Sequence, residues 1–287
     1  MNPLLIAHMN AAPGCDADFD EWYSNVHIRD VMRMQGSSAV QRFAALEAQL
    51  TETPDYRYFT LYDTPDPARL SQAHREAANT PRLVLSRAAD LTDTSVHYYY
   101  PLEFRRRPPS DPPSSPPLDP PLNPPLGPPL GPPLGPMELG DIAIVERMNA
   151  RAGEEERFVA GYRQRLAALT DQPGIVSGAL LHYIPVGQMF RRPPAHAFIA
   201  IYRAAGRDAG FAAWRRVPAG DAGGEAVEEA VRKRVACYAA VTPRIIKDDV
   251  LHGPADALAA TLAATLATEE RVRAKALLTP PPAWGRR

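Results

Sequence analysis

The sequence predicts an α+β protein made of two copies of a βαββαβ unit, the ferredoxin-like order in which helices cover one face of an antiparallel sheet. Two internal matches predict it. The segment HMNAAPG at 8–14 is matched by RMNARAG at 147–153, and YRYFTLYD at 56–63 is matched by HAFIAIYR at 196–203. Because the matches keep the same order along the chain, they indicate two copies of one domain.

The first copy is expected to begin with a strand at 4–10, followed by a helix that starts at Asp18. Asp18 is a suitable N-cap, and Glu21 stands three residues later, as in a capping box. Apolar and aromatic residues then recur at helical spacing to about Met34, and Gly36 follows as a helix-ending residue. These signals predict one continuous amphipathic helix.

The remaining elements follow from composition and from the repeat. Segments rich in β-branched and aromatic residues predict three further strands in the first copy, at 38–45, 56–62 and 95–104. A helix in two pieces, broken near Pro81, is expected at 66–88. Helices of the second copy and the tail are expected near 154–170, 207–216, 223–235 and 254–278.

A proline-rich segment separates the two copies. Of the 32 prolines in the chain, 15 lie at 108–136, where five Pro-Pro-Leu-Asp/Asn/Gly tetrads follow one another. Proline has no backbone N–H, so this segment predicts an extended polyproline II spacer, with a ligand for proline-recognition domains as the alternative. The predicted organisation is therefore a first domain (1–107), a linker (108–136), a second domain (137–253) and a C-terminal helix and tail (254–287).

Composition excludes several classes of function. The net charge is −1, which argues against nucleic acid as a partner because phosphate binding needs a clustered cationic surface. Two cysteines form neither a disulfide framework nor a zinc signature. The first ten residues lack the features of a signal peptide, and no apolar run of 18 residues exists. We therefore expect a cytoplasmic protein with no membrane or nucleic-acid partner.

One segment resembles a known superfamily. FDEWYSNVHIRDVMRMQGSSAVQRF at 19–43 is similar to the first helix and second strand of dimeric α+β barrel proteins, close to the EthD-like members. The positions that carry the resemblance are Trp22, Tyr23, His27, Gly36, Arg42 and Phe43. It implies two ferredoxin-like units that pair their sheets into a barrel, within one chain or between chains. It also implies a small-molecule pocket between each sheet and its helices. The superfamily includes cyclases, isomerases, small lyases, cofactor-free monooxygenases and haem-degrading enzymes, so the fold does not choose the reaction.

Strand alternation and helical spacing select the candidate site. His8 and Asn10 share one strand face, His97 and Tyr99 share another, and His27 lies one turn beyond Tyr23. On the third strand the polar-aromatic face, with Tyr58, is expected to line the pocket, and the apolar face with Phe59 to pack on helices. The catalytic candidates are His27, His8, His97 and Tyr23; the substrate-binding candidates are Asn10, Trp22, Arg42, Tyr58 and Tyr99. For each of these residues a purely structural role in the core is the alternative.

These residue types suit proton transfer and anion binding. Histidine moves protons near neutral pH, tyrosine stabilises an oxyanion, and arginine binds a carboxylate. The chain lacks a glycine-rich phosphate loop, a nucleophile elbow and clustered metal ligands, so no cofactor and no metal are expected. The leading hypothesis is a cofactor-free decarboxylase, cyclase or isomerase acting on an aromatic or polyketide-type acid. A cofactor-free or haem-linked monooxygenase and a non-catalytic binding protein are the alternatives. His27 aligns with Leu166, which predicts that the second copy lacks this site.

Overall fold

The computed structural model describes residues 2–51, 53–78, 80–107, 137–185, 187–190, 192–217, 232–252 and 259–278. The strands are β1 (Leu4–Ala11), β2 (Ala39–Ala45), β3 (Tyr58–Asp63), β4 (Ala89–Arg106), β5 (Ile142–Asn149), β6 (Ile175–Tyr183), β7 (Phe198–Ala204), β8 (Arg232–Ala240) and β9 (Ile245–Ile246). The helices are α1 (Asp16–Trp22), η1 (Tyr23–His27, a π-helical turn), α2 (Ile28–Arg33), α3 (Pro67–Ala77), α4 (Glu155–Thr170), α5 (Arg207–Arg216), α7 (Lys247–His252) and α8 (Ala259–Leu278).

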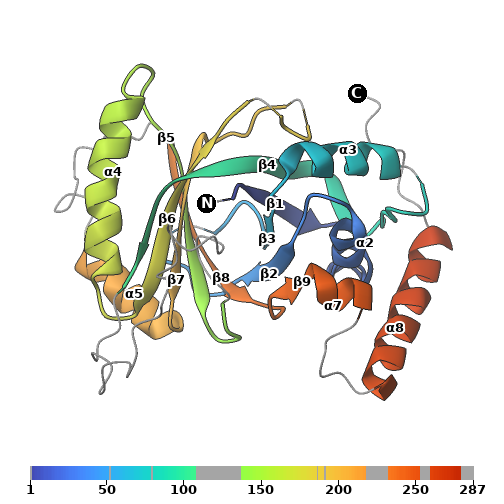
Figure 1. The fold of residues 1–287 in the computed structure, drawn as a ribbon. Helices are drawn as coiled ribbons and strands as arrows, with labels where there is room; N and C mark the ends of the chain where they lie inside the picture. Colours follow the sequence, from blue (N-terminus) through green and yellow to red (C-terminus); the bar gives the residue numbers. More distant parts are fainter. Residues whose placement is uncertain are drawn as a thin grey trace, which may run out of the picture.

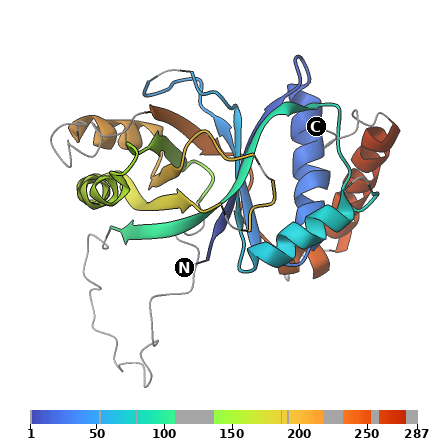
Figure 2. The ribbon, with the colours of Figure 1, turned by 90° about the horizontal axis from the view of Figure 1, so that it is seen from above.

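Eight of the described strands form a closed antiparallel barrel (Figures 1 and 2). Their hydrogen-bonded order is β3-β1-β4-β6-β7-β5-β8-β2, and a β2–β3 ladder closes the ring. The short strand β9 adds to β2 beside β8. The barrel therefore closes within one chain.

The prediction of two ferredoxin-like domains is wrong, because the described strands form a single closed barrel rather than two separate sheets. Strand β4 is 18 residues long, and its two halves pair with different partners. Its N-terminal half pairs with β1, and the half from Tyr99 to Arg106 pairs with β6. Unpaired strand edges leave backbone N–H and C=O groups without partners. Closing the sheet on itself satisfies them, and the interior becomes one shared core.

Two faces of the barrel wall have different roles. Inside, apolar side chains from both halves of the chain pack together, among them Ile6, Phe59, Val145 and Ile201. Outside, α1, η1, α2, α3 and α8 cover the first half, and α4 and α5 cover the second (Figure 2). Because side chains alternate along a strand, each residue of the wall is assigned to the interior or to a helical layer.

Several predicted elements differ from the structure. The first predicted helix exists but consists of α1, η1 and α2, with a π-helical turn in the middle. The helix expected at 66–88 ends with α3 at Ala77. Residues 232–235, expected to end a helix, belong to strand β8. The rest of that prediction, at 223–231, and the linker at 108–136 lie outside the described residues. The domain limits remain a prediction.

The C-terminal helix α8 packs on the first half of the chain. Val272 and Ala276 are buried against the layer formed by α1, η1 and α2. Glu269 accepts two hydrogen bonds from Arg33 and one from Arg273. The predicted tail helix therefore completes the outer layer. No helix in the described parts of the chain combines the length and apolar character needed to cross a membrane.

Candidate active site

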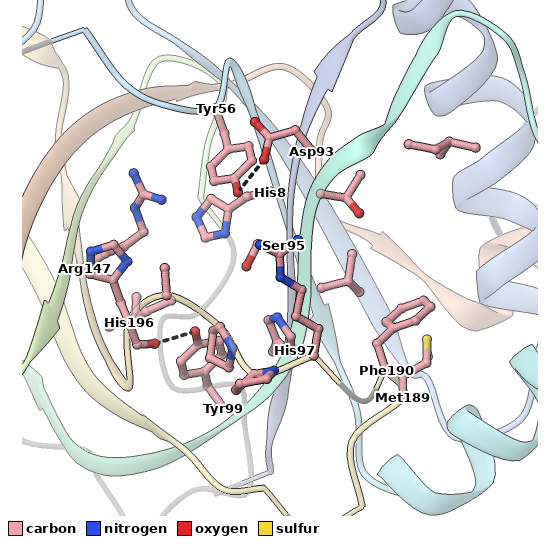
Figure 3. A pocket seen from close by; sticks show the side chains of 18 of the residues that line it. His8, Tyr56, Asp93, Ser95, His97, Tyr99, Arg147, Met189, Phe190 and His196 are labelled. Atoms are coloured by element: carbon pink, nitrogen blue, oxygen red, sulfur yellow. Dashed lines mark hydrogen bonds between the residues drawn. The ribbon is translucent and has the colours of Figure 1, made fainter. Parts of the chain in front are cut away.

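A cavity of about 570 Å³ lies at one mouth of the barrel (Figure 3). This barrel-mouth cavity is lined on its inner side by His8, Tyr56, His97, Tyr99, Arg147 and His196. Its volume falls in the usual range of small-molecule sites. The side chains come from both halves of the sequence, so closure of the barrel is what assembles them.

Strand alternation explains why three of the predicted residues meet here. His8 follows Leu4 and Ile6 on the inward face of β1. On β4, His97 pairs with Ile6 and Tyr99 pairs with Leu4, so both point inward as well. The predicted candidates His8, His97 and Tyr99 therefore line one cavity.

Arg147 is the buried cationic group on the inner side of the cavity, and the sequence argument did not select it. The residue lies on β5 and is 5% exposed. One terminal nitrogen, Nη2, donates to Asp55 Oδ2 at 2.8 Å, and the guanidinium lies 5.4 Å from the centre of the Tyr56 ring. Its buried Nε has no hydrogen-bond partner among the described residues. The signal was in the repeat, since residues 147–153 match 8–14 and so place Arg147 at the position of His8.

The two predicted histidines of the cavity are uncharged at neutral pH. Burial, and then the positive charge of Arg147, hold the pKa of His8 well below its ordinary value. Burial lowers the pKa of His97 to about 4. Among the described residues, His8 Nε2 and His97 Nδ1 are buried without a hydrogen-bond partner. Both residues line the cavity, and a neutral imidazole nitrogen can accept a proton from a bound ligand.

Asn10 has a structural role at the end of β1. Its side chain donates to the Asp55 carbonyl at 3.0 Å and accepts from the Arg57 backbone N–H at 2.8 Å. These contacts hold the chain on both sides of Tyr56. Asn149 makes the same pair of contacts at the end of β5, with the Ala195 carbonyl and the Ala197 N–H, both at 2.7 Å. The two asparagines thus fix the segments that place Tyr56 and His196 in the cavity.

The other predicted residues lie on the opposite, helix-covered face of the wall. Arg42 donates to Ser24 Oγ at 3.0 Å and to Asp20 Oδ1 at 2.5 Å, and its guanidinium lies 4.6 Å from the centre of the Tyr58 ring. Trp22 Nε1 donates to the Val84 carbonyl at 2.9 Å. These contacts hold Arg42, Tyr58 and Trp22 within the first helical layer, away from the inner lining of the barrel-mouth cavity.

The face expected of β3 is reversed. Phe59 and Leu61 point into the barrel, whereas Tyr58 and Tyr62 pack under the helices. Inside the barrel the Phe59 ring packs against the rings of Phe43 and Tyr238, at 5.3 and 5.4 Å between ring centres. The helical layer supplies a partner for a tyrosine hydroxyl, since the Tyr62 and Tyr23 hydroxyls lie 3.3 Å apart.

His27 and Tyr23 border a second, smaller space. This helix-side chamber has a volume of about 40 Å³ and lies between β1 and η1. The His27 ring is 4.9 Å from the Trp22 ring and 4.8 Å from the Tyr23 ring, and burial lowers its pKa to about 3. The structure therefore separates the predicted catalytic set into His8 and His97 on one side of the wall, and His27 and Tyr23 on the other.

Acid should destabilise the fold through His97. Between about pH 6.5 and pH 4 the unfolded chain binds a proton at this histidine and the folded chain does not, so stability falls as pH falls. We expect a loss of about 1–2 kcal/mol from His97 between pH 7.5 and pH 5. Urea unfolding at both pH values checks this, with His97→Gln as the control that lacks the titrating group. An equal acid loss in both proteins would contradict the assignment.

The described residues contain no cluster of three or more side chains able to hold a metal ion. No family model and no curated protein matches the sequence. Among solved structures, an anthrone oxidase-like protein is similar, with a TM-score of 0.57, 14% identity, and coverage of 89% of this chain and 96% of that chain. A candidate monooxygenase from Fusobacterium nucleatum subsp. nucleatum is also similar, with a TM-score of 0.50, 6% identity, and coverage of 84% and 94%.

These likenesses concern the fold. Both extend over most of this chain. They support the closed barrel that eight of the described strands form. Membership of the dimeric α+β barrel superfamily, and of its EthD-like branch, stays a prediction.

Proposed function

We propose that this protein is a cofactor-independent monooxygenase that oxidises a phenolic, polycyclic substrate of the anthrone type in the barrel-mouth cavity. One observation carries the proposal: the same cavity is lined by two histidines, His8 and His97, and by the buried guanidinium of Arg147. Each histidine is neutral and has a ring nitrogen without a hydrogen-bond partner among the described residues. The names of the two similar structures, an anthrone oxidase-like protein and a candidate monooxygenase, support this reaction class. They give no specific support to the lyase, cyclase or isomerase hypothesis.

The cavity matches such a substrate in shape and charge. A volume of about 570 Å³ accommodates a fused-ring aromatic, and Tyr56, Tyr99 and Phe190 provide aromatic walls. Arg147 and the polar edges of His8 and His97 provide the groups that a phenol or its anion would contact. Because Arg147 Nε lacks a partner among the described residues, an anionic ligand oxygen would satisfy a group that is otherwise costly to bury.

The reaction begins with proton transfer. His97 Nδ1 accepts the acidic proton of the substrate, and Arg147 stabilises the resulting anion by a charge-assisted hydrogen bond. The anion, conjugated with the ring system, transfers electrons to dioxygen, and a carbon–oxygen bond forms at the activated methylene. Loss of the second methylene hydrogen as a proton breaks the O–O bond and releases water. One oxygen atom ends in the new carbonyl and one in water, and the substrate supplies all four electrons.

A haem does not fit the space beside His27. The helix-side chamber has only about 40 Å³, and it is lined by Trp22 and Tyr23 from the helices and by Tyr62 from β3. No step of the proposed reaction is assigned to a haem.

The test is oxygen-dependent turnover of a phenolic anthrone such as 1,8-dihydroxyanthrone. Under ¹⁸O₂ we expect one labelled oxygen atom in the quinone, one dioxygen consumed for each substrate, and no hydrogen peroxide released. The non-enzymatic oxidation rate and the His97→Gln variant are the controls. Turnover without dioxygen would contradict the monooxygenase. No acceleration above the buffer rate across a panel of phenolic anthrones would favour the binding-protein alternative.

A further inference from the structure

The helix-side chamber adjoins the barrel-mouth cavity. Five side chains from α3, β4 and the segment after β6 line both spaces: His74, Leu91, Val96, Met189 and Phe190. In Figure 3, Met189 and Phe190 lie on the opposite side of β4 from His8 and Tyr56. A small molecule in the chamber would therefore be separated from a ligand in the cavity only by this shared wall.

The chamber suits a very small apolar molecule. Its lining is mainly apolar and includes Leu5, Ala7, Met9 and Val31. A single water needs roughly 10–15 Å³ of such space, so about 40 Å³ accommodates a diatomic gas but not an aromatic ring. Apolar cavities of proteins stay dry and take up apolar gases such as xenon. Dioxygen, which is small and apolar, meets both conditions.

The second half of the chain fills the equivalent place in the wall with a buried ion pair. In the second half, Glu146 of β5 stands at the position that Ala7 has in β1, 139 residues earlier. Ala7 pairs with Thr60 and Val96, and Glu146 pairs with Ala200 and Val235, in the same places of the wall. The Glu146 carboxylate is completely buried and is bound by Arg165 and the Tyr162 hydroxyl. The Glu146–Arg165 ion pair therefore occupies the space between wall and helix in the second half. In the first half the small side chain of Ala7 leaves that space open as the helix-side chamber.

His27 gives the chamber one polar group. Its Nδ1 is buried and has no hydrogen-bond partner among the described residues. The residue ends the π-helical turn η1, a backbone irregularity that is frequent at functional sites. An uncharged imidazole does not prevent an apolar molecule such as dioxygen from binding. Its N–H can also donate a hydrogen bond to an oxygen atom after dioxygen has been reduced and carries negative charge.

We propose that the helix-side chamber binds dioxygen and supplies it to the substrate through the shared wall, with His27 stabilising the reduced oxygen. This inference rests on the proposed monooxygenase activity. It assigns His27 to the second substrate, while His8, His97 and Arg147 act on the first.

The test compares two matched substitutions, Ala7→Val and Ala200→Val. Both add two methyl groups to a buried alanine on the helix-covered face of the wall, but only Ala7 lines the chamber. Xenon binding, measured by ¹²⁹Xe NMR on the whole protein, reports the chamber without any reaction. We expect a saturable xenon site in the wild type and in Ala200→Val, and its loss in Ala7→Val.

Kinetics then tests the assignment to dioxygen. Ala7→Val should raise KM for dioxygen by about fivefold or more and leave KM for the aromatic substrate unchanged. Met9→Ala enlarges the chamber and should bind xenon more tightly, which keeps the test informative if Ala7→Val does not fold. Absence of a xenon site in the wild type would overturn the proposal, as would an unchanged KM for dioxygen in a folded Ala7→Val protein. If xenon binds and no turnover depends on dioxygen, the proposed function is what fails.

Discussion

Replacing Arg147 by methionine should lower kcat/KM for a phenolic substrate by roughly 10²–10³-fold. The guanidinium is the one buried cation that faces the inner lining of the cavity among the described residues. Methionine keeps most of the length of the side chain but removes the charge that stabilises the substrate anion. Steady-state kinetics at saturating dioxygen measures the effect. The loss should appear in kcat as well as in KM, because the negative charge grows as the proton is transferred.

Two further variants make this prediction specific. Arg147→Lys retains the charge but not the planar fork, so it should recover part of the activity. Arg192→Met changes an exposed arginine that also lines the cavity, and it should have a much smaller effect. Circular dichroism and the unfolding midpoint show whether each variant folds. Equal losses in Arg147→Met and Arg192→Met would contradict a specific role for Arg147.

Replacing Arg165 by methionine should cost about 3–5 kcal/mol of folding free energy. The side chains of Arg165 and Glu146 are essentially inaccessible to solvent, and their charged atoms lie 3.5 Å apart. Removing the arginine leaves the Glu146 carboxylate buried without the guanidinium that balances its charge. We expect the urea midpoint to fall accordingly and the melting temperature to drop by on the order of 10 °C.

The double variant Glu146→Leu/Arg165→Met separates charge burial from packing. It removes both charges while keeping apolar volume, so it should be close to the wild type in stability. The Tyr162 and Tyr202 hydroxyls, 2.9 Å apart, keep each other as partners. A double variant as unstable as Arg165→Met would show that packing, not the unpaired carboxylate, sets the cost. Since Glu146 faces the helices and Arg147 faces the cavity, turnover by the folded double variant should be normal.

The sequence predicted what depends on local pattern. The strand alternation that grouped His8 with Ile6, and His97 with Tyr99, holds in the barrel, and the tail helix exists. It could not show which of the two faces of β3 points inward, because Tyr58 and Phe59 are both suited to burial. The surface that each face packs against determines its direction. Phe59 packs among the strands inside the barrel, and Tyr58 packs under the helices, which offer partners for its hydroxyl.

Long-range contacts account for the remaining errors. Arg42 is expected to bind substrate because it is one of the positions that carry the resemblance and arginine binds carboxylates, but Asp20 and Ser24 of the helical layer bind it instead. Arg147 stands at the position of His8 in the second copy, and the sequence argument did not select it. In the folded chain the two copies face one interior, so Arg147 completes the site that His8 begins. Alignment of the two copies shows that His8 and Arg147 are equivalent positions. It does not show that the two side chains line the same cavity.

The two halves of the chain meet in the barrel at two strand ladders, β4–β6 and β2–β8, and these ladders differ in length. Seven residue pairs join β4 to β6, whereas three join β2 to β8, with two more contributed by β9. Cooperative opening begins where the fewest backbone hydrogen bonds must break. Hydrogen exchange of backbone amides should therefore be fastest where β2 pairs with β8. Local opening should break that ladder and leave the β4–β6 ladder intact. Arg147 lies on β5 and His8 lies on β1, on opposite sides of the β4–β6 ladder. These two side chains should therefore stay connected through the longer ladder when the barrel opens locally.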